Sequence, residues 1–143
     1  MCLALFDICY KVFSHIDYPM QLCYYITMKE DKLSKLSLEL ANQCINLAKQ
    51  LLSMKEHIFA DQIKRSATSV AANIAEAGHP QSRADMISKF EIALKEAFET
   101  GRWLQMIKEA NLVDEQVLAP IDKLCTKIRV LLISSIRTLK AKQ

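Results

Sequence analysis

The chain of 143 residues contains only two glycines and three prolines. Sheet proteins need many turns, and turns draw on glycine and proline. The small number of these residues therefore indicates few turns and long elements. Long uninterrupted elements are helices, and 51% of the residues are hydrophobic, enough to bury a core without staples. We therefore expect a single all-α domain.

Catalytic motifs are also missing. The three histidines, His15, His57 and His79, are scattered along the chain. Neither glycine lies in a phosphate-binding loop, and no serine or cysteine occupies a nucleophile-elbow motif. The sequence therefore predicts no catalytic residue, no metal site, no cofactor and no small-molecule substrate. We expect a protein that is not an enzyme, and an enzyme with an unrecognised site ranks last among the alternatives.

Paired cysteine motifs are absent as well. The five cysteines are an odd number without a CxxC spacing, which does not indicate a disulfide framework. Cys44 and Cys125 fall at core positions of helical patterns, where cysteine packs as a small hydrophobe. A reducing compartment is the natural home of such a chain, so we expect a soluble cytoplasmic protein.

Residues 1–27 differ from the rest of the chain. They hold six of the nine Phe and Tyr residues and only three charges, Asp7, Lys11 and Asp17. The charges interrupt any membrane helix, and the stretch lacks the basic start and cleavage site of a secretory signal. We interpret residues 1–27 as a non-native extension and residues 28–143 as the domain. The alternative is an accessory aromatic arm that packs on the domain.

The intact mass of the endogenous protein tests this interpretation. We expect a species that begins at Met28, because four charged residues follow it directly. A species that begins at Met1 would exclude the proposed start.

Apolar residues recur at spacings of three and four in four segments, the pattern of amphipathic helices. The predicted helices run from about 31 to 54, from 58 to 77, from 82 to 110 and from 114 onward. Their expected core stripes are Leu33, Leu36, Leu40, Cys44, Leu47, Leu51 and Met54; Ile63, Ala67, Val70, Ile74 and Ala77; Ile87, Phe90, Leu94, Ala97, Gly101 and Leu104; and Val117, Ile121, Leu124, Ile128 and Leu131. Short connections between long helices predict an antiparallel up-down-up-down four-helix bundle.

Several residues mark the helix ends. Gly78 should end the second helix in the left-handed conformation. Ser82 and Asp85 have the spacing of a capping pair at the start of the third helix. Asp114 should cap the fourth helix, and Pro120 should either kink it or mark its true first turn.

A second stripe, mostly polar, runs beside the core stripes of the second and third helices. An ordinary solvated face is one explanation, but serine and asparagine are weak helix formers that gain nothing in water. We therefore favour a subunit interface, in which Arg65 and Lys95 pair with glutamates because charges tolerate burial only when paired. The expected interface residues are Gln62, Arg65, Ser69, Asn73, Glu76, Lys95, Glu99 and Trp103.

Basic residues concentrate in the last helix. The macrodipole stabilises cations near a helix C-terminus, so solubility alone can explain them. Alternatively, repetition in an oligomer forms a ring that binds the phosphates of RNA or DNA through many weak contacts. No aromatic residue accompanies these cations in sequence, so we expect little sequence selectivity. The candidate nucleic-acid-binding residues are Lys123, Lys127, Arg129, Arg137 and Lys140.

Two central motifs are more specific. Residues 62–77 read QIKRSATSVAANIAEA, residues 82–85 read SRAD, and residues 92–97 read IALKEA, followed by Glu99-Thr100 and Trp103-Leu104. These segments resemble the signature of the bacterial "four helix bundle protein" family, also called the 23S rRNA intervening-sequence or S23 family. The resemblance covers roughly residues 33–140. The chain departs from the family pattern at Met86 and at Gly101-Arg102, where aromatic residues are usual, so packing beside Trp103 should differ.

The resemblance implies a homopentamer with the bundles arranged like the staves of a barrel. Some relatives are encoded inside intervening sequences of large ribosomal RNA genes. In a distant branch, the accessory protein of diversity-generating retroelements, a basic barrel engages a reverse transcriptase and nucleic acid. Most members have no established function. We therefore expect a homo-oligomeric interaction module that binds RNA or a nucleoprotein partner, and the alternative is a protein scaffold that binds no nucleic acid.

Overall fold

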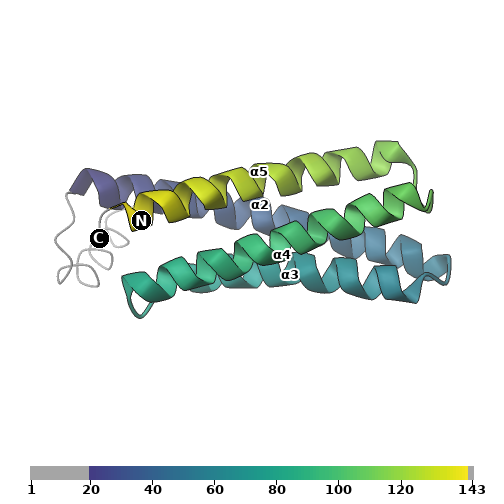
Figure 1. Ribbon diagram of the computed structural model, residues 1–143, viewed down its shortest axis with the longest axis horizontal. Coiled ribbons are helices and arrows are strands. Elements are labelled where there is room, and N and C mark those ends of the chain that lie inside the picture. Colours follow the sequence, from purple (N-terminus) through teal and green to yellow (C-terminus); the bar gives the residue numbers. More distant parts are fainter. Residues whose placement is uncertain (1–19, 142–143) are drawn as a thin grey trace, which may run out of the picture.

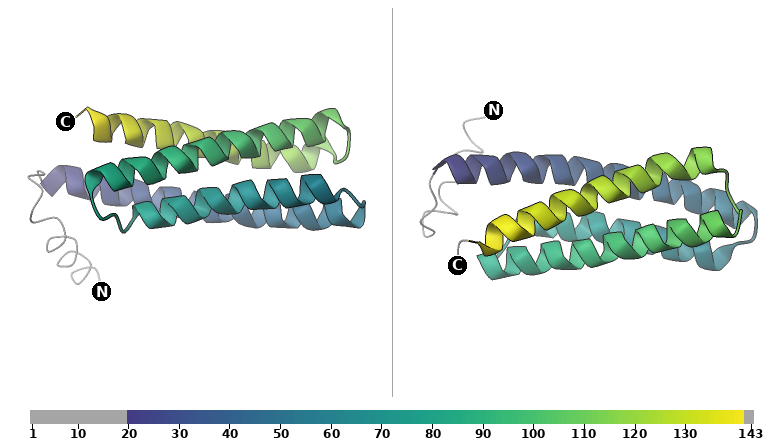
Figure 2. Two further views of the ribbon diagram at one scale, coloured as in Figure 1. Left: turned by 60° about the horizontal axis from the view of Figure 1, so that its bottom comes forward. Right: turned by 45° about the horizontal axis from the view of Figure 1, so that its top comes forward.

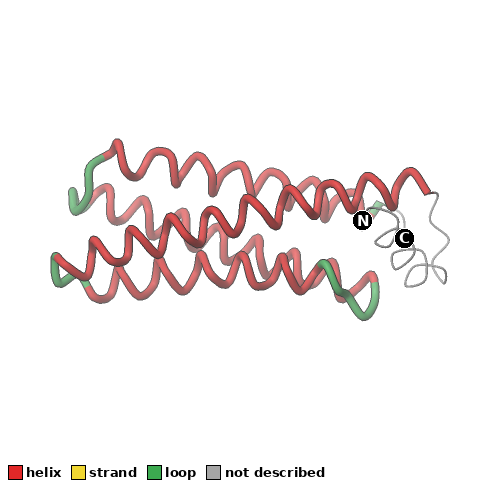
Figure 3. Tube along the Cα trace, turned by 180° about the vertical axis from the view of Figure 1, so that it is seen from behind, coloured by secondary structure: helices red, strands yellow, loops and turns green. Residues whose placement is uncertain are grey.

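The computed structural model describes the backbone of residues 20–141 and the side chains of residues 32–141. It contains four helices, α2 (Met20–Ser53), α3 (His57–Ala77), α4 (Arg83–Glu109) and α5 (Glu115–Lys140), and this part of the chain contains no strand. Consecutive helices run antiparallel, and short loops join them at alternate ends of the molecule (Figure 1, Figure 3). The predicted all-α four-helix bundle is confirmed.

The four helices close around a single core. α2 packs on α3, α3 on α4, α4 on α5 and α5 on α2, which is the expected up-down-up-down order. Figure 2 shows this arrangement from two further sides, with α4 lying between α3 and α5. Each helix therefore buries one face toward the centre and has two edges that meet its neighbours.

α2 is longer than the sequence pattern predicted. It begins at Met20 rather than near residue 31, because no glycine or proline interrupts residues 20–53. Of the predicted extension, residues 1–19 lie outside the described residues, and only the backbone of residues 20–27 is described. The proposed start at Met28 therefore stays a prediction.

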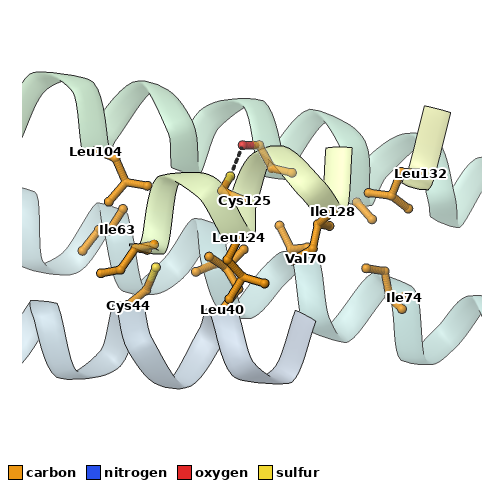
Figure 4. Close-up of a cluster of buried hydrophobic side chains, with 14 of the residues drawn as sticks. Leu40, Cys44, Ile63, Val70, Ile74, Leu104, Leu124, Cys125, Ile128 and Leu132 are labelled. Carbon is orange, nitrogen blue, oxygen red and sulfur yellow. Dashed lines mark hydrogen bonds between the residues drawn. The ribbon is translucent and has the colours of Figure 1, made fainter. Parts of the chain in front are cut away.

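The core consists mainly of aliphatic side chains that the helices contribute at every turn (Figure 4). The predicted stripe of α3 is buried throughout. On α4 the buried stripe is rotated from the prediction, because Thr100 lies inside whereas Leu94 and Gly101 are only partly buried. Val117 of α5 was also assigned to the core wrongly, since it is 41% exposed.

A pair of hydroxyl groups explains the rotation of α4. Thr100 and Ser66 are both fully buried, and the Thr100 Oγ1 lies 3.0 Å from the Ser66 Oγ and 2.9 Å from the Glu96 carbonyl oxygen. Buried polar groups are tolerated when they are hydrogen-bonded. Because these two hydroxyl groups satisfy each other, polar residues occupy positions that the apolar pattern alone would not assign to the core.

The two cysteines of the described core are free and buried, as their positions predicted. Burial and, to a smaller extent, the nearby Cys125 raise the pKa of the Cys44 thiol to about 12. Burial also raises the pKa of Cys125 to about 11. The Cys125 Sγ lies 3.2 Å from the Ala97 carbonyl oxygen (Figure 4). Both groups are therefore neutral thiols at physiological pH.

These thiols should make the fold less stable at alkaline pH. A thiol in the unfolded chain ionises near pH 9, whereas the folded protein keeps both protons to about pH 11 or 12. The unfolded state therefore binds fewer protons in this range, and the free energy of unfolding should fall as the pH rises above about 9. Urea midpoints at pH 8 and pH 10.5 measure the decline. The double variant Cys44→Ala/Cys125→Ala should decline less; an equal decline would contradict the prediction.

The helix ends agree only in part with the sequence. Gly78 has a φ of −72°, so the predicted left-handed stop is wrong, and a tight turn instead joins the Gly78 N–H to the Ala75 carbonyl oxygen at 3.2 Å. The left-handed residues are Lys55 (φ 65°) and Asn111 (φ 52°), in the loops after α2 and α4.

The predicted capping pair is confirmed. The Ser82 Oγ accepts a hydrogen bond from the Asp85 N–H at 3.1 Å, and the Asp85 carboxylate accepts one from the Gln81 N–H at 3.1 Å. Asp114 occupies the N-cap position of α5 without a side-chain capping bond. α5 is continuous through Pro120, so this residue does not mark the start of the helix.

Candidate interaction surfaces

The polar stripes of α3 and α4 meet along the shared edge of these two helices. This surface, which we call the polar seam, consists of Gln62, Arg65, Ser69, Asn73 and Glu76 of α3 and Lys89, Glu96, Glu99 and Trp103 of α4. The two helices form an antiparallel hairpin, so residues of α3 meet residues of α4 in the reverse order along the chain. The seam therefore follows directly from the hairpin geometry.

Arg65 is the centre of the seam. Its guanidinium donates to a Glu99 carboxylate oxygen and lies 4.0 Å from the Glu96 carboxylate. It also donates to the Gln62 Oε1 at 3.1 and 3.2 Å. The Arg65 side chain is 51% exposed and that of Glu96 is 16% exposed. Arg65 thus pairs with two of the expected glutamates within its own subunit.

Aromatic residues support one end of this network. The Trp103 Nε1 donates to the Glu99 Oε1 at 3.4 Å, and the Phe59 ring meets the Trp103 ring edge-on with centroids 6.1 Å apart. The Glu99 carboxylate therefore receives donors from both helices. The Glu96 Oε2 is buried and accepts no hydrogen bond from any described residue.

The other end of the seam is held by a second ion pair. Lys89 donates to the Glu76 carboxylate, which raises the pKa of Lys89 above its ordinary value through this hydrogen bond and its charge. The Asn73 amide donates to the Ser69 carbonyl oxygen at 2.9 Å, within α3. Lys89 was missing from the sequence prediction, although the Glu76–Lys89 pair follows the register of the Arg65–Glu99 pair, since Glu76 comes 11 residues after Arg65 and Lys89 comes 10 residues before Glu99.

Lys95 is the one expected interface residue that lies beside the seam rather than in it. It follows Ile92 by three residues and precedes Glu96 by one, so it points about 100° away from Glu96. Its side chain is exposed and forms no ion pair with another described residue. Ile92, by contrast, lies at the seam edge and is 40% exposed.

The five basic residues predicted to bind nucleic acid fall into two groups. Lys123, Lys127 and Arg137 are exposed, and their spacing places them on one outward face of α5. This face, which also includes Val130 and Ser134, is called the outer α5 stripe. None of these three cations forms an ion pair with another described residue.

Arg129 and Lys140 turn toward α4 instead. The Lys140 Nζ lies 2.6 Å from the Glu91 carboxylate. The Arg129 Cζ lies 5.2 Å from the centre of the Phe98 ring, and its Nη2 donates to the Thr126 Oγ1 at 2.6 Å. The prediction that no aromatic residue accompanies the cations is therefore wrong at Arg129, because the antiparallel packing of α4 and α5 brings Phe98 beside it.

A groove of about 510 Å³ lies between α4 and α5 next to this pair. We call it the α4–α5 groove, and its charged lining includes Arg102, Lys108, Glu115, Asp122, Lys123 and Arg129. The Lys108 Nζ pairs with the Glu115 carboxylate at 2.6 Å. Three cations therefore remain against one carboxylate, so the groove has an excess of positive charge.

The described residues contain no group of three His, Cys, Asp or Glu side chains that could hold a metal ion. Four-helix bundles that hold two metal ions use a Glu-x-x-His motif within a helix. Glu76 and His79 have this spacing, but His79 lies beyond the end of α3 and Glu76 pairs with Lys89. None of the helices in the described part of the chain is both long and apolar enough to cross a membrane.

Comparisons with known proteins match this architecture. A solved structure of a protein of unknown function from the S23 ribosomal protein family of Bacteroides thetaiotaomicron is 41% identical, with a TM-score of 0.73. The alignment covers 76% of this chain and 98% of that chain. No curated protein matches. The family model of the 23S rRNA-intervening sequence protein matches residues 29–134, a range that includes the whole polar seam, and the chain therefore belongs to this family.

Proposed function

We propose that the protein is a non-enzymatic homo-oligomer of the cytoplasm that binds RNA, using the polar seam for contact between subunits. The observation that carries the oligomer is the Arg65–Glu96–Glu99–Trp103 network on the outside of the α3–α4 pair. Such a network is more ordered and less lysine-rich than a surface that only faces water. The two free core thiols agree with a reducing compartment.

The polar seam is suited to burial against a second copy of the chain. Covering an unpaired charge is costly, but Arg65 and Lys89 already have carboxylate partners within the subunit. Ser69 and Asn73 are small, so a neighbouring helix can approach α3 closely. A second copy can therefore dock here without leaving a charge unsatisfied.

A ring of subunits would allow the basic residues to bind RNA phosphates together. The family resemblance suggests a pentamer, and a ring requires the seam of one copy to meet a different face of the next. The outer α5 stripe would then be repeated in every subunit. Weak phosphate contacts repeated in this way add up to useful affinity without any new contact.

Native mass spectrometry tests the oligomer. Asn73→Leu should lower the assembly mass, because it adds bulk at the seam without breaking an ion pair inside a subunit. Lys95→Glu, which reverses a charge beside the seam, should do the same. Glu99→Ala should do the same but also removes the partner of Arg65, so its helicity must be checked. Asn46→Leu, at an exposed position of α2, is the matched control. Unchanged assembly in all three seam variants would refute the interface.

Binding to structured RNA, single-stranded RNA and duplex DNA across a salt series tests the proposed RNA binding. We expect affinity to fall steeply as salt rises, because phosphate contacts release counterions. The alternative function is a protein scaffold, which the exposed apolar side chains Leu38 (61%) and Ile58 (72%) favour. No RNA or DNA binding at low salt would select the scaffold.

A further inference from the structure

We propose that the α4–α5 groove holds an unpaired nucleotide of single-stranded RNA, with the base stacked on Phe98 and Arg129 and the phosphates near Arg102 and Lys123. This inference rests on the proposed RNA binding and deepens it. It adds base stacking to the phosphate contacts of the outer α5 stripe, with which the groove shares Lys123.

The Phe98 side chain is exposed and the Arg129 guanidinium lies over its ring, which makes a short stack that a base can extend. Phe98 is 51% exposed, whereas Phe90 on the same helix is 1% exposed, so Phe98 contributes little to the core. The Arg129 guanidinium lies against its ring, and the bond to the Thr126 hydroxyl holds it there. Unpaired bases stack both on aromatic rings and on guanidinium planes.

Gly101 keeps this arrangement open. A Cβ at this position would lie 3.3 Å from the Arg129 Nη1, a tighter contact than side chains normally make. With glycine there, the guanidinium can lie close to α4 and the groove beside it stays unfilled. The volume of about 510 Å³ is within the range of about 300–1,000 Å³ that is usual for small-ligand sites.

The charge of the groove favours a nucleotide over an apolar peptide. Arg102, Lys123 and Arg129 face one unpaired carboxylate, Asp122, because Lys108 is neutralised by Glu115. A flat aromatic surface beside excess cations is the combination that single-stranded nucleic acids use. A duplex cannot use it, because its bases are already stacked and paired.

Fluorescence anisotropy of the full-length protein with a labelled 12-nucleotide RNA, single-stranded or annealed to its complement, tests the site. Phe98→Leu should weaken single-strand binding by roughly 5- to 150-fold, because a base loses its stacking partner. The salt dependence should not change, because no cation is removed. Phe98→Tyr should retain affinity, and Gly101→Leu should reduce it by filling the groove. Leu38→Ala, an exposed apolar residue of α2, is the matched control.

Photo-crosslinking gives an independent readout that does not depend on substituted residues. With 4-thiouridine RNA we expect the crosslink on the tryptic peptide 96–102, which contains Phe98. If RNA binds but Phe98→Leu has no effect and the crosslinks fall on peptides of the outer α5 stripe, the groove assignment is wrong while the proposed function stands. Equal affinity for the duplex would also overturn it. If no RNA binds to the parent protein, both proposals fail.

Discussion

The triple variant Lys123→Gln/Lys127→Gln/Arg137→Gln should bind RNA with a much weaker dependence on salt than the parent protein. Each phosphate contact with a single strand contributes about 0.7 units to the slope of log affinity against log salt, so the loss of three contacts should remove about two units. Near 0.1 M salt, the affinity should fall roughly 100-fold. The three side chains are exposed on one face and have no carboxylate partner among the described residues, so they are available to phosphates.

Removal of an equal charge elsewhere provides the control. Lys32, Lys35 and Lys49 are exposed on α2, and their replacement by glutamine changes the net charge by the same amount. This second triple variant should retain most of the parent slope. If both triple variants lose affinity equally, net charge alone governs binding and the outer α5 stripe is not a binding surface.

Phe90→Ala should lower the free energy of unfolding by about 3–5 kcal/mol, the usual loss when a buried phenylalanine is truncated. Phe90 is 1% exposed and is among the largest fully buried side chains of the described core. Typical domains have only about 5–15 kcal/mol of stability, so the variant should be close to unfolding. Urea unfolding at a fixed protein concentration measures the change, because the proposed association of subunits would also contribute to apparent stability.

Phe98→Ala is the matched control for this core substitution. The residue type and the helix are the same, but Phe98 is 51% exposed and its ring contacts the Arg129 guanidinium. A cation–π contact at an exposed site is worth about 0.5–1 kcal/mol, so the loss should be near 1 kcal/mol. Similar losses for the two variants would show that the core is not organised around Phe90.

The helices and their order were predictable because they depend on local patterns. A scarcity of glycine and proline leaves helices uninterrupted, and a period of three and four defines their buried faces. The whole core stripe of α3 and the capping pair at Ser82 and Asp85 were found in this way. Most residues of the polar seam share this periodicity, but Lys89 was missed and Lys95 lies beside the seam.

Features that depend on two helices were decided only by the tertiary structure. The rotation of α4 follows from the buried contact between Ser66 and Thr100, which are 34 residues apart. Likewise, the pattern of α5 alone could not show that Arg129 lies over the Phe98 ring of α4 rather than beside the other cations of α5. One helix determines which residues share a face, because that depends on its own period. Which residue each face meets depends on the register of its neighbour, and only the packed bundle sets that register.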